Sequence, residues 1–125
     1  MDKILAFVRI TYLWMILLPV SIMFVGAASN QIVMIANHDS FPVLVNDTRF
    51  ENLPSAGMID KQHCVMTSET HLNMLADIFD FGHDGIESIG DLCLDFGQWL
   101  WTFAPYVWGV IVIRKLYFLD YEGII

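Results

Sequence analysis

The sequence has few charged residues and very few basic ones. Charged residues make up 16% of the 125 residues, against a usual ~25%, and 6 lysines and arginines stand against 14 aspartates and glutamates. A small soluble domain needs many charged residues to cover its surface, so this shortage argues against that class. The lack of a basic patch also argues against displacement of counterions from phosphates, and we expect no nucleic-acid partner.

Motifs for catalysis and cofactor binding are equally scarce. There is no Gly-x-Ser-x-Gly, phosphate loop or dinucleotide fingerprint, and no His-x-x-x-His or Cys-x-x-Cys pair. We therefore predict a protein that is not an enzyme, with no catalytic residue, no cofactor and no metal. Two cysteines do not make a disulfide framework, but one bridge between Cys64 and Cys93 is permitted outside the cytoplasm. The alternative is that Cys93 is a small buried apolar residue.

Apolar residues are in excess, at 56% of the chain against a usual ~45–50%. They concentrate in two uncharged runs, residues 10–28 and 96–113, each close to the ~20 residues that cross a hydrocarbon core of ~30 Å. We predict an all-α membrane protein, a two-helix transmembrane hairpin with a partly ordered loop containing one short amphipathic helix. The first helix is expected over residues 1–36 and the second over residues 88–115. A cleaved signal peptide is the alternative for the first run.

Basic residues flank the outer ends of the two runs. They are Lys3 and Arg9 before the first run, and Arg114 and Lys115 after the second. The positive-inside rule then places both chain ends in the cytoplasm, including a tail at 116–125, and the acidic loop 37–87 outside. The predicted location is a cell membrane, the inner membrane in a bacterium, with the lipid bilayer as a partner. The expected interfacial anchors are Trp99, Trp101, Arg114 and Lys115.

The loop contains two candidate elements. Residues 41–45, FPVLV, favour one short strand, which has little stability alone. Residues 68–81 predict the amphipathic helix, because a capping hydroxyl and Glu69 precede an apolar stripe and Gly82 follows it. The stripe consists of Leu72, Leu75, Ile78 and Phe79. We expect this stripe to lie on the bilayer surface or on the two spans.

The second helix has a start signal of its own. Ser88 and Asp91 have the spacing of a capping box directly before the apolar run, so the helix is expected to begin at Ser88. Asp91 and Asp95 then share one face. One interpretation is a cap followed by a solvated first turn, and the other is a pair that handles ions or protons. Gly97, Gly109 and Ser21 are expected to allow close helix packing.

Three stretches together resemble an uncharacterised family of small bacterial integral membrane proteins. They are residues 29–45, 67–79 and 88–101, which carry the pattern Ala-Asn with Pro-Val, then Thr-x-Leu-x-x-Leu-x-Asp, then Ser-x-Gly-Asp. The matching positions are Ala36, Asn37, Pro42, Val43, Thr70, Leu72, Leu75, Asp77, Ser88, Gly90, Asp91 and Gly97. The resemblance implies a membrane location and no activity.

The sequence departs from that family in two ways. The glycines expected after Asn37 are replaced by His38, Asp39 and Ser40, and we expect no room before the first run for the extra amino-terminal helices that family members carry. A short stand-alone version of such a core is consistent with a phage or mobile-element origin. The candidate site positions that follow from the resemblance are Asn37, Pro42, Thr70, Asp77, Ser88, Gly90 and Asp91.

The function expected from these patterns is a non-enzymatic partner-binding or structural subunit, which associates with itself or with a larger membrane protein through its helices and its acidic external loop. The alternative is a membrane-permeabilising oligomer similar to a phage holin. The polar residues that would line its defect are Gln98, Thr102, Ser21 and Asp95. A metalloprotein built on the loop histidines is the third and weakest hypothesis.

Overall fold

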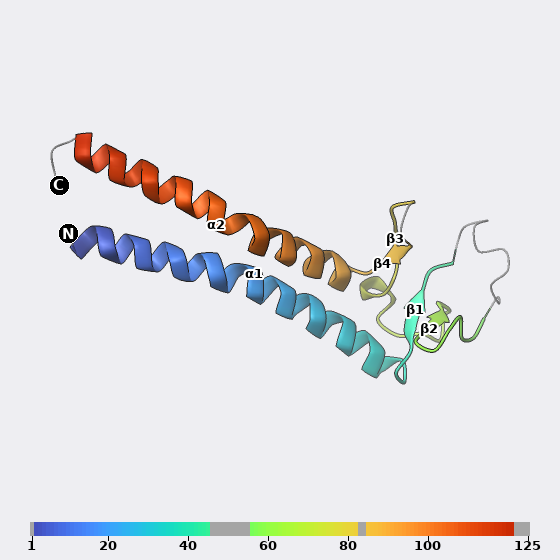
Figure 1. Cartoon of the computed structure of the whole chain (residues 1–125). Coiled ribbons are helices and arrows are strands. Elements are labelled where there is room, and N and C mark those ends of the chain that lie inside the picture. Colours follow the sequence, from blue (N-terminus) through green and yellow to red (C-terminus); the bar gives the residue numbers. More distant parts are fainter. Residues whose placement is uncertain (1, 46–55, 83–84, 122–125) are drawn as a thin grey trace. The chain divides into compact units, whose positions relative to one another are not determined.

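Two long helices and four short strands make up the described part of the chain in the computed structural model, which describes residues 2–45, 56–82 and 85–121. Figure 1 shows them in chain order as α1 (Asp2–Ala36), β1 (Phe41–Val43), β2 (His63–Val65), β3 (Phe79–Asp80), β4 (Ile86–Glu87) and α2 (Ile89–Tyr121). They fall into two compact units. Unit 1 consists of Met1–Met23 and Asp95–Ile125, and unit 2 of Phe24–Leu94.

The two helices follow the two apolar runs of the sequence. α1 matches the helix predicted over residues 1–36, and α2 begins directly after Ser88 but continues past Lys115 to Tyr121, so the predicted tail is helical at its start. Both helices are long and apolar enough to cross a membrane, and only 11% and 6% of their most apolar windows are buried inside the molecule. A helix in the core of a soluble protein is both apolar and mostly buried. These two helices are apolar but mostly exposed.

Unit 1 pairs antiparallel segments of α1 and α2. A Cβ on Gly97 would lie 3.0 Å from the carbonyl oxygen of Pro19, so the missing side chain lets α2 approach α1. Further along the pair, the indole N–H of Trp108 donates a hydrogen bond of 2.9 Å to the hydroxyl of Thr11. The packing role predicted for Gly97 is confirmed. No described atom lies within 4 Å of a Cβ built on Gly109, so this glycine takes no part in packing between the described helices, and a contact with a partner there stays a prediction.

Unit 2 contains two small sheets. β1 pairs in parallel with β2, with Phe41 opposite His63, and β3 pairs with β4 in antiparallel orientation. The short strand predicted over residues 41–45 therefore forms, and it has a partner that gives it the stability a lone strand lacks. The expectation of an all-α chain is corrected by these strands.

A small hydrophobic core holds unit 2 together. Its buried members are Val33 from α1, Phe41 from β1 and Ala76 from the segment before β3. Met34, Met66 and Leu75 pack around them. Because these residues come from a helix, a strand and a loop, the end of α1 is tied to the loop region by apolar burial.

The prediction of an amphipathic helix over residues 68–81 is wrong. The segment forms the 3-10 turn Asn73–Leu75 and strand β3, and Leu72, before the turn, has a left-handed backbone with φ of 57°, which a right-handed helix does not allow. The hydroxyl of Thr70 accepts the backbone N–H of Thr67 at 3.1 Å. Local side-chain hydrogen bonds of this kind compete with helix formation. The later residues of the segment pair with other parts of unit 2, which also prevents a helix there.

Candidate functional site

The candidate motif positions of the sequence all lie in unit 2. They are Asn37, Pro42, Thr70, Asp77, Ser88, Gly90 and Asp91. Ser88, Gly90 and Asp91 lie where α2 begins, Pro42 and Asp77 are joined along β1, and Asn37 ends α1. The fold thus brings together positions that are far apart in the sequence.

A polar junction connects the end of α1 to the start of α2, and we use this name for Asn30, Asp77, Ser88 and Asp91. The capping box is present as predicted: the backbone N–H of Asp91 donates to the Ser88 hydroxyl at 3.0 Å, and the Ser88 N–H donates to Asp91 Oδ2 at 3.1 Å. The Asn30 amide donates to Asp91 Oδ1 at 2.7 Å. The cap is therefore also a contact between two helices.

The Ser88 hydroxyl has one proton to donate and two neighbouring oxygens that can accept it. It lies 2.7 Å from Asp91 Oδ2 and 2.9 Å from Asn30 Oδ1, and Ser88 is fully buried. A hydroxyl donates one hydrogen bond at a time; Asp91 Oδ2 also accepts the Ser88 N–H, so Asn30 Oδ1 is the oxygen that lacks a donor when the hydroxyl turns to Asp91.

Two glycines allow this junction to form. A Cβ on Gly26 would lie 2.5 Å from the carbonyl oxygen of Gly90 and 2.9 Å from the Cβ of Cys93, and a Cβ on Gly90 would overlap the side chain of Asn30. Glycine at both positions thus brings the backbones of α1 and α2 close enough for Asn30 to reach the start of α2.

Asp77 is a buried carboxyl group with an unsatisfied oxygen. Its side chain is 7% exposed, and Oδ1 has no hydrogen-bond partner among the described residues. Its backbone is fixed beside β1, since its N–H donates to the Pro42 carbonyl at 3.1 Å and its carbonyl accepts the Leu44 N–H at 2.8 Å. The sheet thus holds the carboxyl group in place without satisfying it.

Burial is the main cause that raises the pKa of Asp77, to about 7. The negative charge of Asp91 raises it further, His63 opposes the change, and Glu87 adds a smaller increase. Asp77 therefore titrates near neutral pH and can hold a proton or a cation there.

A cavity of about 140 Å³ opens beside these groups. Its lining residues are Asn30, Met34, Phe41, Gln62, His63, Asp77 and Asp91. The His63 ring is half exposed and lies 2.8 Å from Asp60, whose pKa is lowered to about 2 by hydrogen bonds from the Gln62 N–H and from His63. The cavity therefore combines one unsatisfied carboxyl group with polar and apolar walls.

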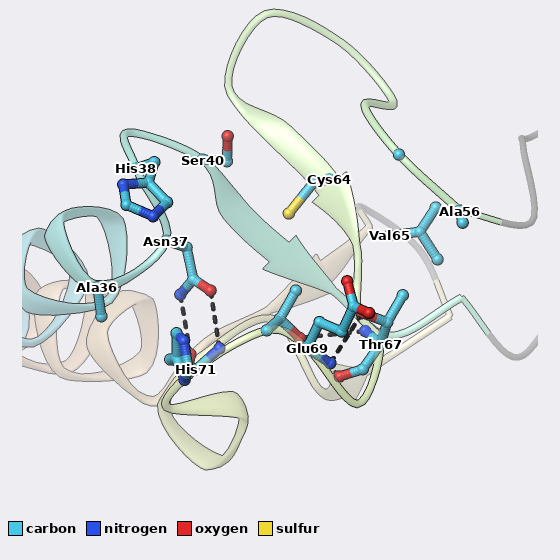
Figure 2. Close-up of a pocket in the computed structure, with 12 residues that line it drawn as sticks. Ala36, Asn37, His38, Ser40, Ala56, Cys64, Val65, Thr67, Glu69 and His71 are labelled. Atoms are coloured by element: carbon cyan, nitrogen blue, oxygen red, sulfur yellow. Dashed lines mark hydrogen bonds between the residues drawn. The ribbon is translucent and has the colours of Figure 1, made fainter.

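Asn37 closes the end of α1 and holds the following loop. Its amide donates to the His71 carbonyl at 2.8 Å, and its Oδ1 accepts the His71 N–H at 2.8 Å. Figure 2 shows this pair at one side of a second cavity, of about 340 Å³. His38 and Asp39 both adopt positive φ in the turn that follows α1. The turn therefore forms without the glycines that usually adopt this conformation.

The thiols and histidines do not converge on one site. Cys64 and Cys93 are both free, so the predicted bridge is absent: Cys64 lines the second cavity, whereas Cys93 packs against Gly26. Burial raises the pKa of the Cys64 thiol. Within the described ranges, no three His, Cys, Asp or Glu side chains are placed to share a metal ion. His83, one of the candidate ligands, lies outside the described residues.

The predicted interfacial anchors are exposed residues of α2. Trp99 and Trp101 are 55% and 49% exposed, and the Trp99 ring contacts that of Phe103 with centroids 5.0 Å apart. The Arg114 guanidinium lies 5.6 Å from the centre of the Phe118 ring. These positions suit anchoring at a membrane surface, a role that stays a prediction.

Sequence reasoning missed the core of this site. It identified the Ser88 cap, and it named Asp77 only through the family pattern. It gave no role to Gly26, Phe41 or the cavity. The signal for Gly26 was its place in the small-residue stretch 26–28 at the end of the first apolar run.

Comparisons with known proteins support the family-level resemblance. A model of a family described as a family of unknown function, DUF5317, matches residues 4–103. No curated protein matches the chain, and no solved structure matches it. The matched region covers α1, the loop with its strands and the first half of α2.

Proposed function

Because the chain belongs to DUF5317, a family of unknown function, we propose its role from its own geometry. The proposed role is a small integral membrane protein with two spans that acts as a non-enzymatic partner-binding or structural subunit. Both chain ends are cytoplasmic and loop 37–87 faces outside, as the flanking bases favour.

The observation that carries this proposal is the large apolar surface of both helices. Trp14, Phe24, Tyr106 and Ile113 are between 64% and 73% exposed, and many other apolar side chains of α1 and α2 are similarly open. Surface of this extent on a soluble monomer would mark an interaction site or cause aggregation. Lipid tails and partner helices are the two environments that cover it without cost.

A groove in unit 1 supports partner binding beyond lipid contact. It has a volume of about 360 Å³. Its walls are Thr11, Trp14, Met15, Leu18, Trp99, Leu100, Phe103, Ala104, Val107, Trp108 and Ile111. Large aromatic side chains around a concave apolar surface suit the packing of another transmembrane helix, because packing drives association within lipid.

A photo-crosslinking amino acid at two adjacent leucines tests this proposal. Leu18 lines the groove and is 49% exposed, whereas Leu17 does not line it and is 53% exposed. We expect the probe at position 18 to form a discrete protein adduct in native membranes, while the probe at position 17 reacts mainly with lipid.

The mass of the adduct distinguishes the partners. Twice the mass of the chain indicates self-association, and another mass indicates a different membrane protein. Equal absence of protein adducts at both positions, together with a monomeric mass in mild detergent, would contradict the partner-binding role.

A second candidate is the holin-like oligomer. A polar stripe on α2 supports it: Asp95, Gln98 and Thr102 recur at helical spacing and are all exposed. Ser21 on α1 is exposed as well. Leakage of a trapped dye on expression would favour this candidate, whereas a partner-binding subunit leaves the membrane sealed.

A further inference from the structure

We propose that the cavity beside the polar junction binds a primary alkylammonium group, either of a free amine or of a lysine side chain, with the Asp77 carboxylate as its ionic partner. This inference does not rest on the proposed membrane role. It concerns a site whose residues all lie in unit 2.

The unsatisfied oxygen of Asp77 favours a ligand that donates hydrogen bonds. Asp77 is 7% exposed, lines the cavity, and its Oδ1 lacks a partner among the described residues. A buried polar atom without a hydrogen bond is costly, so a donor that reaches Oδ1 from the cavity through a small side-chain movement would relieve that cost. An ammonium group supplies both the donor and the opposite charge.

Further hydrogen-bond acceptors lie close to Asp77. An ammonium group carries three N–H donors. Asn30 and Asp91 both line the cavity, and their oxygens compete for the single Ser88 hydroxyl proton, so each carries an acceptor that the hydroxyl does not satisfy at all times. Asp91 also adds a second negative charge beside Asp77. The junction therefore attracts a cation and disfavours an anion.

The remaining walls of the cavity are partly apolar. Met34 and Phe41 line the same cavity, and an aromatic face or a thioether suits an alkyl chain with a positive end better than it suits a metal ion. The described residues place no three ligating His, Cys, Asp or Glu groups together. A cavity of about 150 Å³ holds a benzene-sized molecule, so one of about 140 Å³ has room for a butyl chain.

Calorimetric titration of the full chain in a non-ionic detergent tests the site, with n-butylammonium chloride as the ligand and n-butanol as the neutral match. We expect saturable binding of the amine at pH 8.5 and none of the alcohol. Asp77→Asn should weaken amine binding about tenfold or more, because it removes the charged acceptor while keeping its shape. Asp39→Asn removes an exposed carboxylate outside the cavity and should leave binding unchanged.

The wild-type protein provides a test that needs no variant. The pKa of Asp77 is near 7, with Asp91, Glu87 and His63 as the charged or titratable groups that act on it. Amine binding should therefore be weaker at pH 5.5 than at pH 8.5, since Asp77 is then protonated while the amine keeps its charge. Binding that is equal at both pH values would overturn the role of Asp77.

A lysine model separates the two sources of the ammonium group. If Nα-acetyl-lysine N-methylamide binds about as well as n-butylammonium, the site admits a protein side chain. If only n-butylammonium binds, the site takes a small free amine. Both results support the ammonium site, whereas no saturable binding of either probe, or equal binding to wild type and Asp77→Asn, refutes it. The crosslinking result at Leu18 is independent of this outcome, because Leu18 lies in unit 1.

Discussion

Asp77→Asn should stabilise the protein at pH 8 and change its stability little at pH 4. The folded-state pKa of Asp77 is about 7, above the value of 3.8 for a free side chain. The folded protein therefore binds the proton more tightly than the unfolded chain, and wild-type stability falls as the pH rises from about 4 to about 7. The loss reaches about 4 kcal/mol at most, and asparagine avoids it by staying neutral.

The measurement is the free energy of unfolding in detergent at several pH values, compared between wild type and variant. Asp39→Asn, at an exposed turn position, is the control and should keep the wild-type pH profile. The exposed Asp60, with a pKa lowered to about 2, acts in the opposite direction but only below about pH 4. Parallel profiles for wild type and Asp77→Asn would show that Asp77 is not buried as described.

Gly26→Ala should destabilise unit 2 by about 1–3 kcal/mol, the usual cost of overpacking. The new Cβ would meet the Gly90 carbonyl oxygen at 2.5 Å and the Leu94 backbone nitrogen at 3.1 Å, and backbone atoms cannot rotate away. Gly109→Ala is the matched control, because no described atom lies within 4 Å of its Cβ. Alanine there should be neutral or stabilise α2 by up to about 1 kcal/mol.

Chemical or thermal unfolding of the two alanine variants in the same detergent measures this difference. Gly26→Ala should also move the Asn30 and Ser88 amide resonances, since both lie in the polar junction. If the two substitutions had equal effects on the unfolding midpoint, the close approach of α1 and α2 at Gly26 would be wrong.

The helices could be predicted from the sequence because they depend on local patterns. Uncharged runs at 10–28 and 96–113 give the positions of α1 and α2, and the Ser88 cap gives the start of α2 to within one residue. The extension to Tyr121 was not predicted, because Arg114 and Lys115 end the uncharged run, whereas the helix continues beyond the end of that run.

The loop could not be predicted because distant residues determine its structure. The segment 68–81 has a helical apolar stripe, but Asn37 binds the backbone of His71, and Asp77 pairs with β1. No local sequence pattern indicates either of these pairings. The burial of Asp77 has the same origin, since it depends on residues from α1, β1 and α2 that meet only after folding.

The most direct test of the two-span account is the accessibility of single cysteines in intact cells. Both native thiols are replaced by alanine, and one new cysteine is placed at Lys61 in the loop or at Tyr117 near the end of α2. Both side chains are exposed, so neither result depends on burial in the fold.

The account predicts that a membrane-impermeant thiol reagent labels Lys61→Cys in intact cells, and labels Tyr117→Cys only after the membrane is opened. Labelling of both positions in intact cells, or of neither, would contradict the proposed topology. Labelling of Tyr117→Cys alone would mean an inverted hairpin, with the acidic loop and its ammonium site on the cytoplasmic side.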